Sequence, residues 1–117
     1  AVSAFVTFGE ENHHNIIQLK EYIDTIDTHP VGIGLHFTIT AGSPVNGNRY
    51  RTLTIANGNF SLFDFFRWNV SLEEFEQELD AQLSKLAELL GGIEYIDHIN
   101  CHQGICFLKK EFWEIVS

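Results

Sequence analysis

Hydrophobic and polar residues alternate between Val31 and Thr40, a pattern typical of a β-strand with one buried face. Successive side chains of a strand point to opposite faces, so the alternation divides this stretch into two sets. The first set is apolar throughout and consists of Val31, Ile33, Leu35, Phe37 and Ile39. The second set consists of Gly32, Gly34, His36, Thr38 and Thr40. We therefore expect a strand whose apolar face meets helices and whose other face presents His36 to a site.

The same period of two returns near the end of the chain, between Tyr95 and His102. Here the alternation places His98, Asn100 and His102 on one face. We expect this strand to begin at about Ile93. Together with the strand that carries His36, two strands of the protein then present imidazole side chains.

The first 30 residues predict a strand followed by a helix. The segment from Ala1 to Phe8 is rich in residues that favour strands and is expected to be buried. After Gly9, Asn12 can cap a helix whose apolar residues recur every three or four positions and which ends before Pro30. Such a crossover helix makes the following strand parallel to the first one. His13 and His14 fall in its first turn, where we expect solvated surface.

A second helix is predicted from Ser71, because Ser71 and Glu74 form the pattern of a capping box. Its apolar face consists of Leu72, Phe75, Leu79, Leu83, Leu86 and Leu90. The pair Gly91 and Gly92 ends it, and its many carboxylates are expected on the opposite, solvated face. A shorter amphipathic helix is predicted over residues 107–116.

Residues 41–69 lose this periodicity and are expected to leave the sheet, with a short extended stretch from Tyr50 to Ile55. The second half of this excursion is rich in aromatic residues, namely Phe60, Phe63, Phe65, Phe66 and Trp68. We expect these rings to pin the excursion to the core. The alternative is that one or two of them form a stacking wall for a ligand.

This order of elements predicts an α/β fold with a parallel sheet and crossover helices. The 117 residues form a single domain and are fewer than the roughly 250 of a complete (β/α) barrel, so we expect a partial, barrel-like arrangement. Three parallel strands leave two unpaired edges. We therefore expect a homo-oligomer, most simply a two-fold dimer.

Charge and composition narrow the range of partners. The net charge is −9 with only seven Lys and Arg, which argues against binding of nucleic acid or an anionic membrane surface. No apolar run approaches the roughly 20 residues that span a bilayer. Cys101 and Cys106 have a spacing that no disulfide framework requires, so we expect both to be reduced, in a cytoplasmic protein.

The histidines of the two strands are candidate metal ligands. Lying on neighbouring parallel strands, His36 and His102 can converge on one divalent ion at the carboxyl end of the sheet. Hydrolysis at such an ion usually needs a carboxylate ligand and open water positions as well. In one alternative, His36 is an ordinary hydrogen-bonded histidine of the sheet. In another, a structural zinc site is formed by Cys101, His102, Cys106 and His98.

These motifs, in this order and at these separations, resemble the YdjC-like carbohydrate deacetylases, of which chitooligosaccharide deacetylase is the best-known member. The resemblance rests on Gly-Leu-His-Phe-Thr-Ile-Thr-Ala-Gly-Ser-Pro-Val at residues 34–45, the helix from Ser71, and His-Ile-Asn-Cys-His-Gln at residues 98–103. It implies a barrel-like (β/α) protein that removes acetyl groups from N-acetylated sugars with a divalent ion, magnesium or zinc. Residues 1–117 would then resemble the middle part of such a barrel.

The resemblance also implies roles for single residues. His36 and His102 match two metal ligands of the family, and His98 matches a further motif histidine, which suggests a catalytic or orienting role. The family's third ligand comes from an Asp-Asp pair on a strand that would precede Ala1, and Asn100 stands where the family has Asp. We therefore expect a metal-dependent hydrolase-like domain for N-acetylated oligosaccharides, incomplete or weakly active by itself. The alternative is a non-catalytic carbohydrate-binding or structural relative.

Overall fold

The computed structural model is an α/β structure with a three-stranded parallel sheet, as the sequence pattern predicts. It describes residues 2–25, 32–45, 59–60, 71–102 and 110–116, without the side chains of Val2, Phe112 and Trp113. In chain order the elements are β1 (Val2–Ala4), α1 (Glu10–Asp24), β2 (Ile33–Phe37), α3 (Leu72–Leu90), η1 (Ile93–Tyr95), β3 (Ile96–Cys101) and α4 (Lys110–Val116). The predicted extended stretch from Tyr50 to Ile55 lies outside these ranges. Of the aromatic residues in the predicted excursion, Phe60 alone lies within them. Closure into a barrel stays a prediction.

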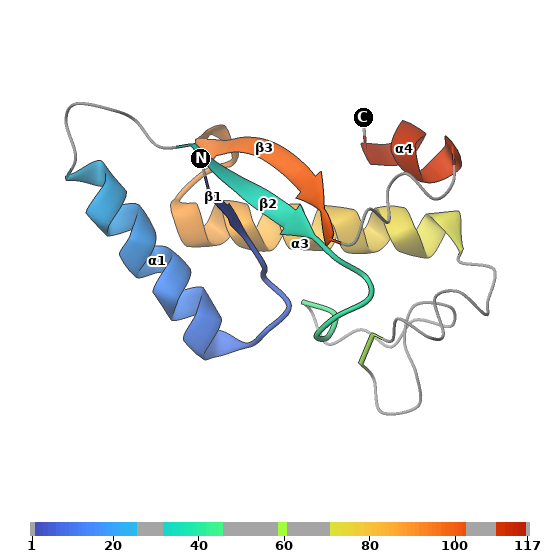
Figure 1. Cartoon of the computed structure of the whole chain (residues 1–117), viewed down its shortest axis with the longest axis horizontal. Coiled ribbons are helices and arrows are strands. Elements are labelled where there is room, and N and C mark those ends of the chain that lie inside the picture. The colour runs from blue at the N-terminus through green and yellow to red at the C-terminus, as the bar shows by residue number, and fades with distance from the viewer. Residues whose placement is uncertain (1, 26–31, 46–58, 61–70, 103–109, 117) are drawn as a thin grey trace.

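Strand β2 is the centre of the sheet, which has the order β1-β2-β3. Gly34 is level with Ser3 of β1 on one side and with His98 of β3 on the other. Further along, His36 is level with Asn100. Helix α3 runs behind the strands and covers one face of the sheet (Figure 1). The opposite face therefore carries the polar residues of all three strands.

The covered face of β2 forms the core, as its alternation predicts. Ile33, Leu35 and Phe37 are almost fully inaccessible to solvent. The ring of Phe37 packs edge-on against Phe75 of α3, with 5.3 Å between the ring centroids. Burying such side chains contributes about 1.5–3 kcal/mol each, which makes this strand–helix contact a main source of stability.

Thr38 and Thr40, just after β2, are buried, although the alternation predicts them on the same face as His36. The strand ends at Phe37, and Thr38 and Thr40 are 0% and 7% exposed. The side chain of Gln82 in α3 donates to the carbonyl oxygen of Thr38 at 2.7 Å and accepts from its backbone N–H at 3.4 Å. The helix thus supplies hydrogen bonds that a neighbouring strand would otherwise make.

Glu78 is an exception to the predicted solvated face of α3, because its side chain is fully buried. It lies one turn before Gln82, whose amide donates to Glu78 Oε2 at 2.7 Å. The prediction that all carboxylates of this helix face solvent is therefore wrong. A buried carboxylate needs hydrogen-bond donors, and Gln82 is one of them.

The ends of α3 follow the predicted signals. Ser71 accepts a hydrogen bond from the backbone N–H of Glu74, and Gly91 ends the helix with a left-handed φ of 93°. Phe75, Leu79, Leu86 and Leu90 are buried, while Leu72 in the first turn is 41% exposed. The apolar face therefore begins one turn later than predicted.

Helix α1 begins at Glu10, with Gly9 as its N-cap, so the prediction that Asn12 caps it is wrong. Asn12 instead donates to the carbonyl oxygen of Phe5 at 2.6 Å, and His13 donates to that of Val6 at 2.8 Å. The ring of His13 is half-buried, which corrects the prediction of a solvated side chain. The first turn of α1 therefore fixes the backbone that follows β1.

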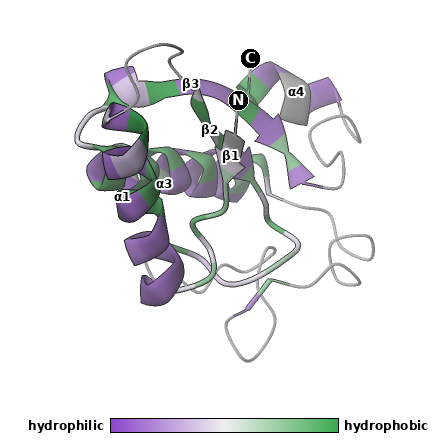
Figure 2. Cartoon of the chain, turned by 60° about the vertical axis from the view of Figure 1, so that its left-hand side comes forward, coloured by the Kyte–Doolittle hydropathy of each residue, from purple (hydrophilic) through white to green (hydrophobic). Residues whose placement is uncertain are grey.

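Hydrophilic residues cover much of α1 (Figure 2). Within the part of the chain that the structure describes, no helix is long and apolar enough to cross a membrane.

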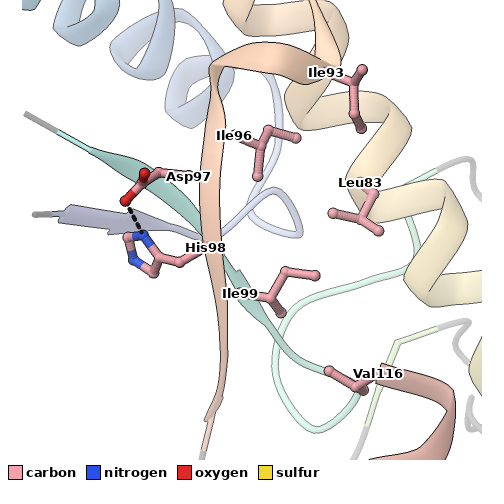
Figure 3. A pocket seen from close by; sticks show the side chains of 7 residues that line it. All are labelled: Leu83, Ile93, Ile96, Asp97, His98, Ile99 and Val116. Carbon is pink, nitrogen blue, oxygen red and sulfur yellow. Dashed lines mark hydrogen bonds and ion pairs between the residues drawn. The ribbon is translucent and has the colours of Figure 1, made fainter.

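Strand β3 contains a bulge at Asp97. Ile33 is level with Ile96, but the next residue of β2, Gly34, is level with His98. Ile96 and Ile99 consequently both point toward α3, while Asp97 and His98 point to the other side of the ribbon (Figure 3). The residues from Ile93 to Tyr95 form a short 3-10 helix, so the strand begins three residues later than predicted.

An apolar pocket of about 500 Å³ lies between β3, α3 and α4. It is lined by Leu83, Ile93, Ile96, Asp97, His98, Ile99 and Val116 (Figure 3). Neither His36 nor His102 belongs to its lining. The pocket is therefore separate from these two imidazoles, although Asp97 and His98 contribute to its lining.

The hydrogen bonds of Gln82 predict a stability effect. Gln82→Leu leaves both backbone groups of Thr38 without this partner, so we expect the free energy of unfolding to fall by about 1–3 kcal/mol. Urea denaturation measures the change. Gln77→Leu is the matched control, because Gln77 is exposed on the same helix. Equal losses in the two variants would contradict a role for the Gln82–Thr38 contact.

Candidate metal-binding site

His36 and His102 lie side by side at the carboxyl end of the sheet. Nε2 of His36 is 3.2 Å from Nδ1 of His102, and the ring planes are inclined by 73°. Two imidazole nitrogens that bind one tetrahedral ion at 2.0–2.1 Å are about 3.3 Å apart. The two rings therefore suit two ligand positions of a single divalent ion.

Neighbouring elements deliver these two rings to the same face. His36 lies between the buried residues Leu35 and Phe37, so its own side chain points to the polar face of β2. His102 immediately follows the last residue of β3. Because β2 and β3 are parallel, their carboxyl ends meet at one edge and bring the two imidazoles together.

Asn100 joins His36 to β1. Its Oδ1 is 2.5 Å from Nδ1 of His36, and its Nδ2 donates to the hydroxyl of Ser3 at 3.3 Å. The sequence pattern places Asn100 on this face but does not predict either contact. The signal that could have found them is the register of His36 with Asn100.

Phe5 forms an aromatic wall beside both imidazoles, a role that the sequence pattern does not predict. Its ring lies edge-on to His36 and His102, at centroid distances of 4.6 and 5.1 Å. Alternation from Ser3 would have placed Phe5 on the polar face of β1. This ring excludes water from one side of the two imidazoles.

His98 lies on the same face but apart from this pair. A Cβ atom on Gly34 would overlap the imidazole of His98, so the ring covers the surface that this glycine leaves open. Nδ1 of His98 donates to Oδ2 of Asp97 at 3.3 Å. Within the described ranges, no hydrogen bond or ring contact joins His98 to His36 or His102.

Burial favours the neutral form of His102. Desolvation, and to a smaller degree the neighbouring His36, lower the pKa of His102 below its ordinary value. Only the neutral ring is a metal ligand, so this shift keeps His102 available to an ion at a lower pH than an exposed histidine.

Cys101 is disulfide-bonded. The prediction that it is reduced is therefore wrong, and so is the alternative zinc site, which needs its thiolate. The only other cysteine of the sequence, Cys106, lies outside the described residues.

The donor set of the site is two imidazoles. Among the residues that the structure describes, no group of three or more His, Cys, Asp or Glu side chains could hold a metal ion. His36 and His102 thus fit part of a hydrolytic metal site, which usually has a third protein ligand.

Known proteins with similar sequences are carbohydrate deacetylases. The chitooligosaccharide deacetylase of Proteus mirabilis (strain HI4320) is 32% identical over 82 residues, which cover 70% of this chain and 32% of that protein. Carbohydrate deacetylase 1 of Listeria innocua serovar 6a is 38% identical over 77 residues, covering 62% of this chain and 30% of that protein. The chain spans about a third of the length of these relatives.

A solved structure shares the fold. It is a protein of Enterococcus faecalis V583 named for cellobiose-phosphate cleavage, with a TM-score of 0.67 and 22% sequence identity. The match covers 97% of this chain and 52% of that protein. The family model described as YdjC-like protein matches residues 10–117, almost the whole sequence. The chain therefore belongs to the YdjC-like protein family.

Proposed function

We propose that this chain carries part of the active site of a metal-dependent hydrolase that removes acetyl groups from N-acetylated oligosaccharides. The observation that carries the proposal is the 3.2 Å approach of His36 Nε2 to His102 Nδ1. The names of the two curated relatives support the substrate class. Because the chain spans about a third of those relatives, the proposal concerns the activity of a whole protein of this kind.

His36 and His102 would hold the divalent ion, magnesium or zinc, through these two nitrogens. When bound, such an ion polarises an amide carbonyl and lowers the pKa of a water ligand. The lowered pKa of His102 keeps its ring neutral for binding. Phe5 shields one side of both rings from solvent, which strengthens electrostatic interactions there.

His98 is the candidate general acid for the leaving amine. It lies on the same sheet face as His36, and Asp97 holds its Nδ1–H. This contact fixes the orientation of the ring, and an imidazole placed beside the leaving group can transfer a proton to it.

The alternative is a non-catalytic role. Among the described residues, no group of three or more His, Cys, Asp or Glu side chains could hold a metal ion. A carbohydrate-binding or structural relative of the deacetylases would keep this sheet and need no third ligand.

Removal of either imidazole tests ion binding. We expect His36→Ala and His102→Ala to lose calorimetrically detected binding of Zn²⁺ or Mg²⁺, because one remaining imidazole is a weak site. His14→Ala is the control, because His14 is exposed on α1. In a whole protein of this kind, acetate release from a chitooligosaccharide should disappear together with ion binding. Unchanged ion binding in both variants would exclude this pair as ligands, and ion binding without acetate release by the whole protein would favour the non-catalytic role.

The protonation of His102 is testable by NMR titration of the metal-free protein. We expect its imidazole pKa to lie below the ordinary histidine value, because burial disfavours the charged ring. His36→Gln should raise this pKa only in part, since burial is the larger cause. A pKa at or above the ordinary value in the unsubstituted protein would contradict the buried, paired geometry.

Gly34→Ala tests the role of His98 independently of the His36–His102 pair. The added methyl group overlaps the His98 ring and forces it to move, while His36 and His102 keep their contact. We expect ion affinity to change less than about two-fold, and acetate release by the whole protein to fall by roughly the 10²–10⁴-fold typical of a lost general acid. His98→Gln should have the same effect. Full acetate release by His98→Gln would show that His98 is not the acid.

A further inference from the structure

The carboxamide of Asn100 lies between Ser3 and His36. Its Nδ2 donates to the hydroxyl of Ser3 at 3.3 Å, which leaves Oδ1 facing Nδ1 of His36 at 2.5 Å. A carbonyl oxygen can only accept hydrogen bonds. Nδ1 of His36 must therefore carry a proton to form this contact.

The position of that proton determines what the other nitrogen can do. A neutral imidazole carries one proton, so the Nδ1–H form leaves a lone pair on Nε2. In His36 this lone pair points toward Nδ1 of His102, 3.2 Å away. It therefore lies where the two imidazoles would share an ion.

We propose that Asn100 is a positioning residue that holds His36 as its Nδ1–H tautomer and so makes Nε2 the ion-binding atom. The proposal rests on the proposed function for its ligand, a divalent ion. The tautomer itself is a property of the metal-free chain and can be measured without that ion. Outer hydrogen-bond partners of this kind fix the ring orientation and tautomer of metal-binding histidines.

The same geometry predicts that His102, unlike His36, has a different tautomer in the metal-free and the ion-bound chain. With a lone pair on Nε2 of His36, the contact between the rings requires a proton on Nδ1 of His102 in the metal-free chain. To bind an ion through Nδ1, the neutral His102 ring would have to carry its proton on Nε2 instead. His36 is thus set in advance for the ion, whereas His102 changes its tautomer on binding.

Three proteins test the role of Asn100 through the ¹⁵N NMR signals of their imidazoles, in metal-free form. We expect Nδ1–H at His36 in the unsubstituted protein. Asn100→Asp should keep this tautomer, because a carboxylate also only accepts. Asn100→Leu, similar in size but without an acceptor, should give a mixture of both tautomers. Circular dichroism checks that each variant is folded, and exposure of Asn100 makes the substitutions tolerable.

Zn²⁺ titration of the same proteins supplies a second measurement. We expect Asn100→Leu to weaken binding by about ten- to a hundred-fold, the usual effect of removing an outer partner. Asn100→Asp should bind more tightly than the unsubstituted protein, because a carboxylate makes the ring a stronger donor. Gln18→Leu is the matched control, since Gln18 makes an amide–imidazole contact with His14 on exposed α1 at 3.2 Å. It should alter neither measurement.

The outcomes separate the two proposals. An Nε2–H tautomer at His36 in the unsubstituted protein, or an unchanged tautomer in Asn100→Leu, overturns the role of Asn100. Equal Zn²⁺ affinity in Asn100→Leu and the unsubstituted protein also overturns it. If the unsubstituted protein binds no divalent ion, the proposed function fails, and the ¹⁵N signals still decide whether Asn100 sets the tautomer.

Discussion

The parallel pairing of β2 with β3 in one register is the constraint on which the candidate site depends. It places His36 level with Asn100 and brings His102 beside His36. A shift of one residue would turn every side chain of β2 to the other face. The apolar residues Leu35 and Phe37 prevent such a shift, because they would lose their burial against α3. The hydrophobic core thus fixes the position of the polar groups.

Features with a local cause could be predicted from the sequence. The faces of β2 follow from strict alternation, and the cap at Ser71 and the end at Gly91 follow from backbone chemistry within one turn. The meeting of His36 and His102 also follows from local patterns, once both strands are taken as parallel. The strand faces and the helix ends need only the immediate neighbours of a residue in the chain, whereas the meeting of the two imidazoles also needs the parallel pairing of β2 with β3.

Features made by contacts between distant segments could not be predicted in this way. Glu78 and Gln82 resemble ordinary surface residues of a helix, but Gln82 packs against Thr38 just after β2 and also donates to the buried Glu78. Phe5 was missed because its partners lie about 30 and 100 residues further along the chain. For Glu78 and Gln82 the tertiary contact outweighs the local preference.

Because β3 contains a bulge at Asp97, the number of residues in this strand matters more than which residue lies at the bulge. Ile96 and Ile99 are three positions apart, so a regular strand cannot place both against the helices. The extra residue allows both to be packed there and turns Asn100 toward His36. Loss of one residue at this point would exchange the core-facing and site-facing sets downstream. A substitution at the bulge therefore leaves this arrangement possible, whereas a change in the number of residues there would remove the site together with part of the core.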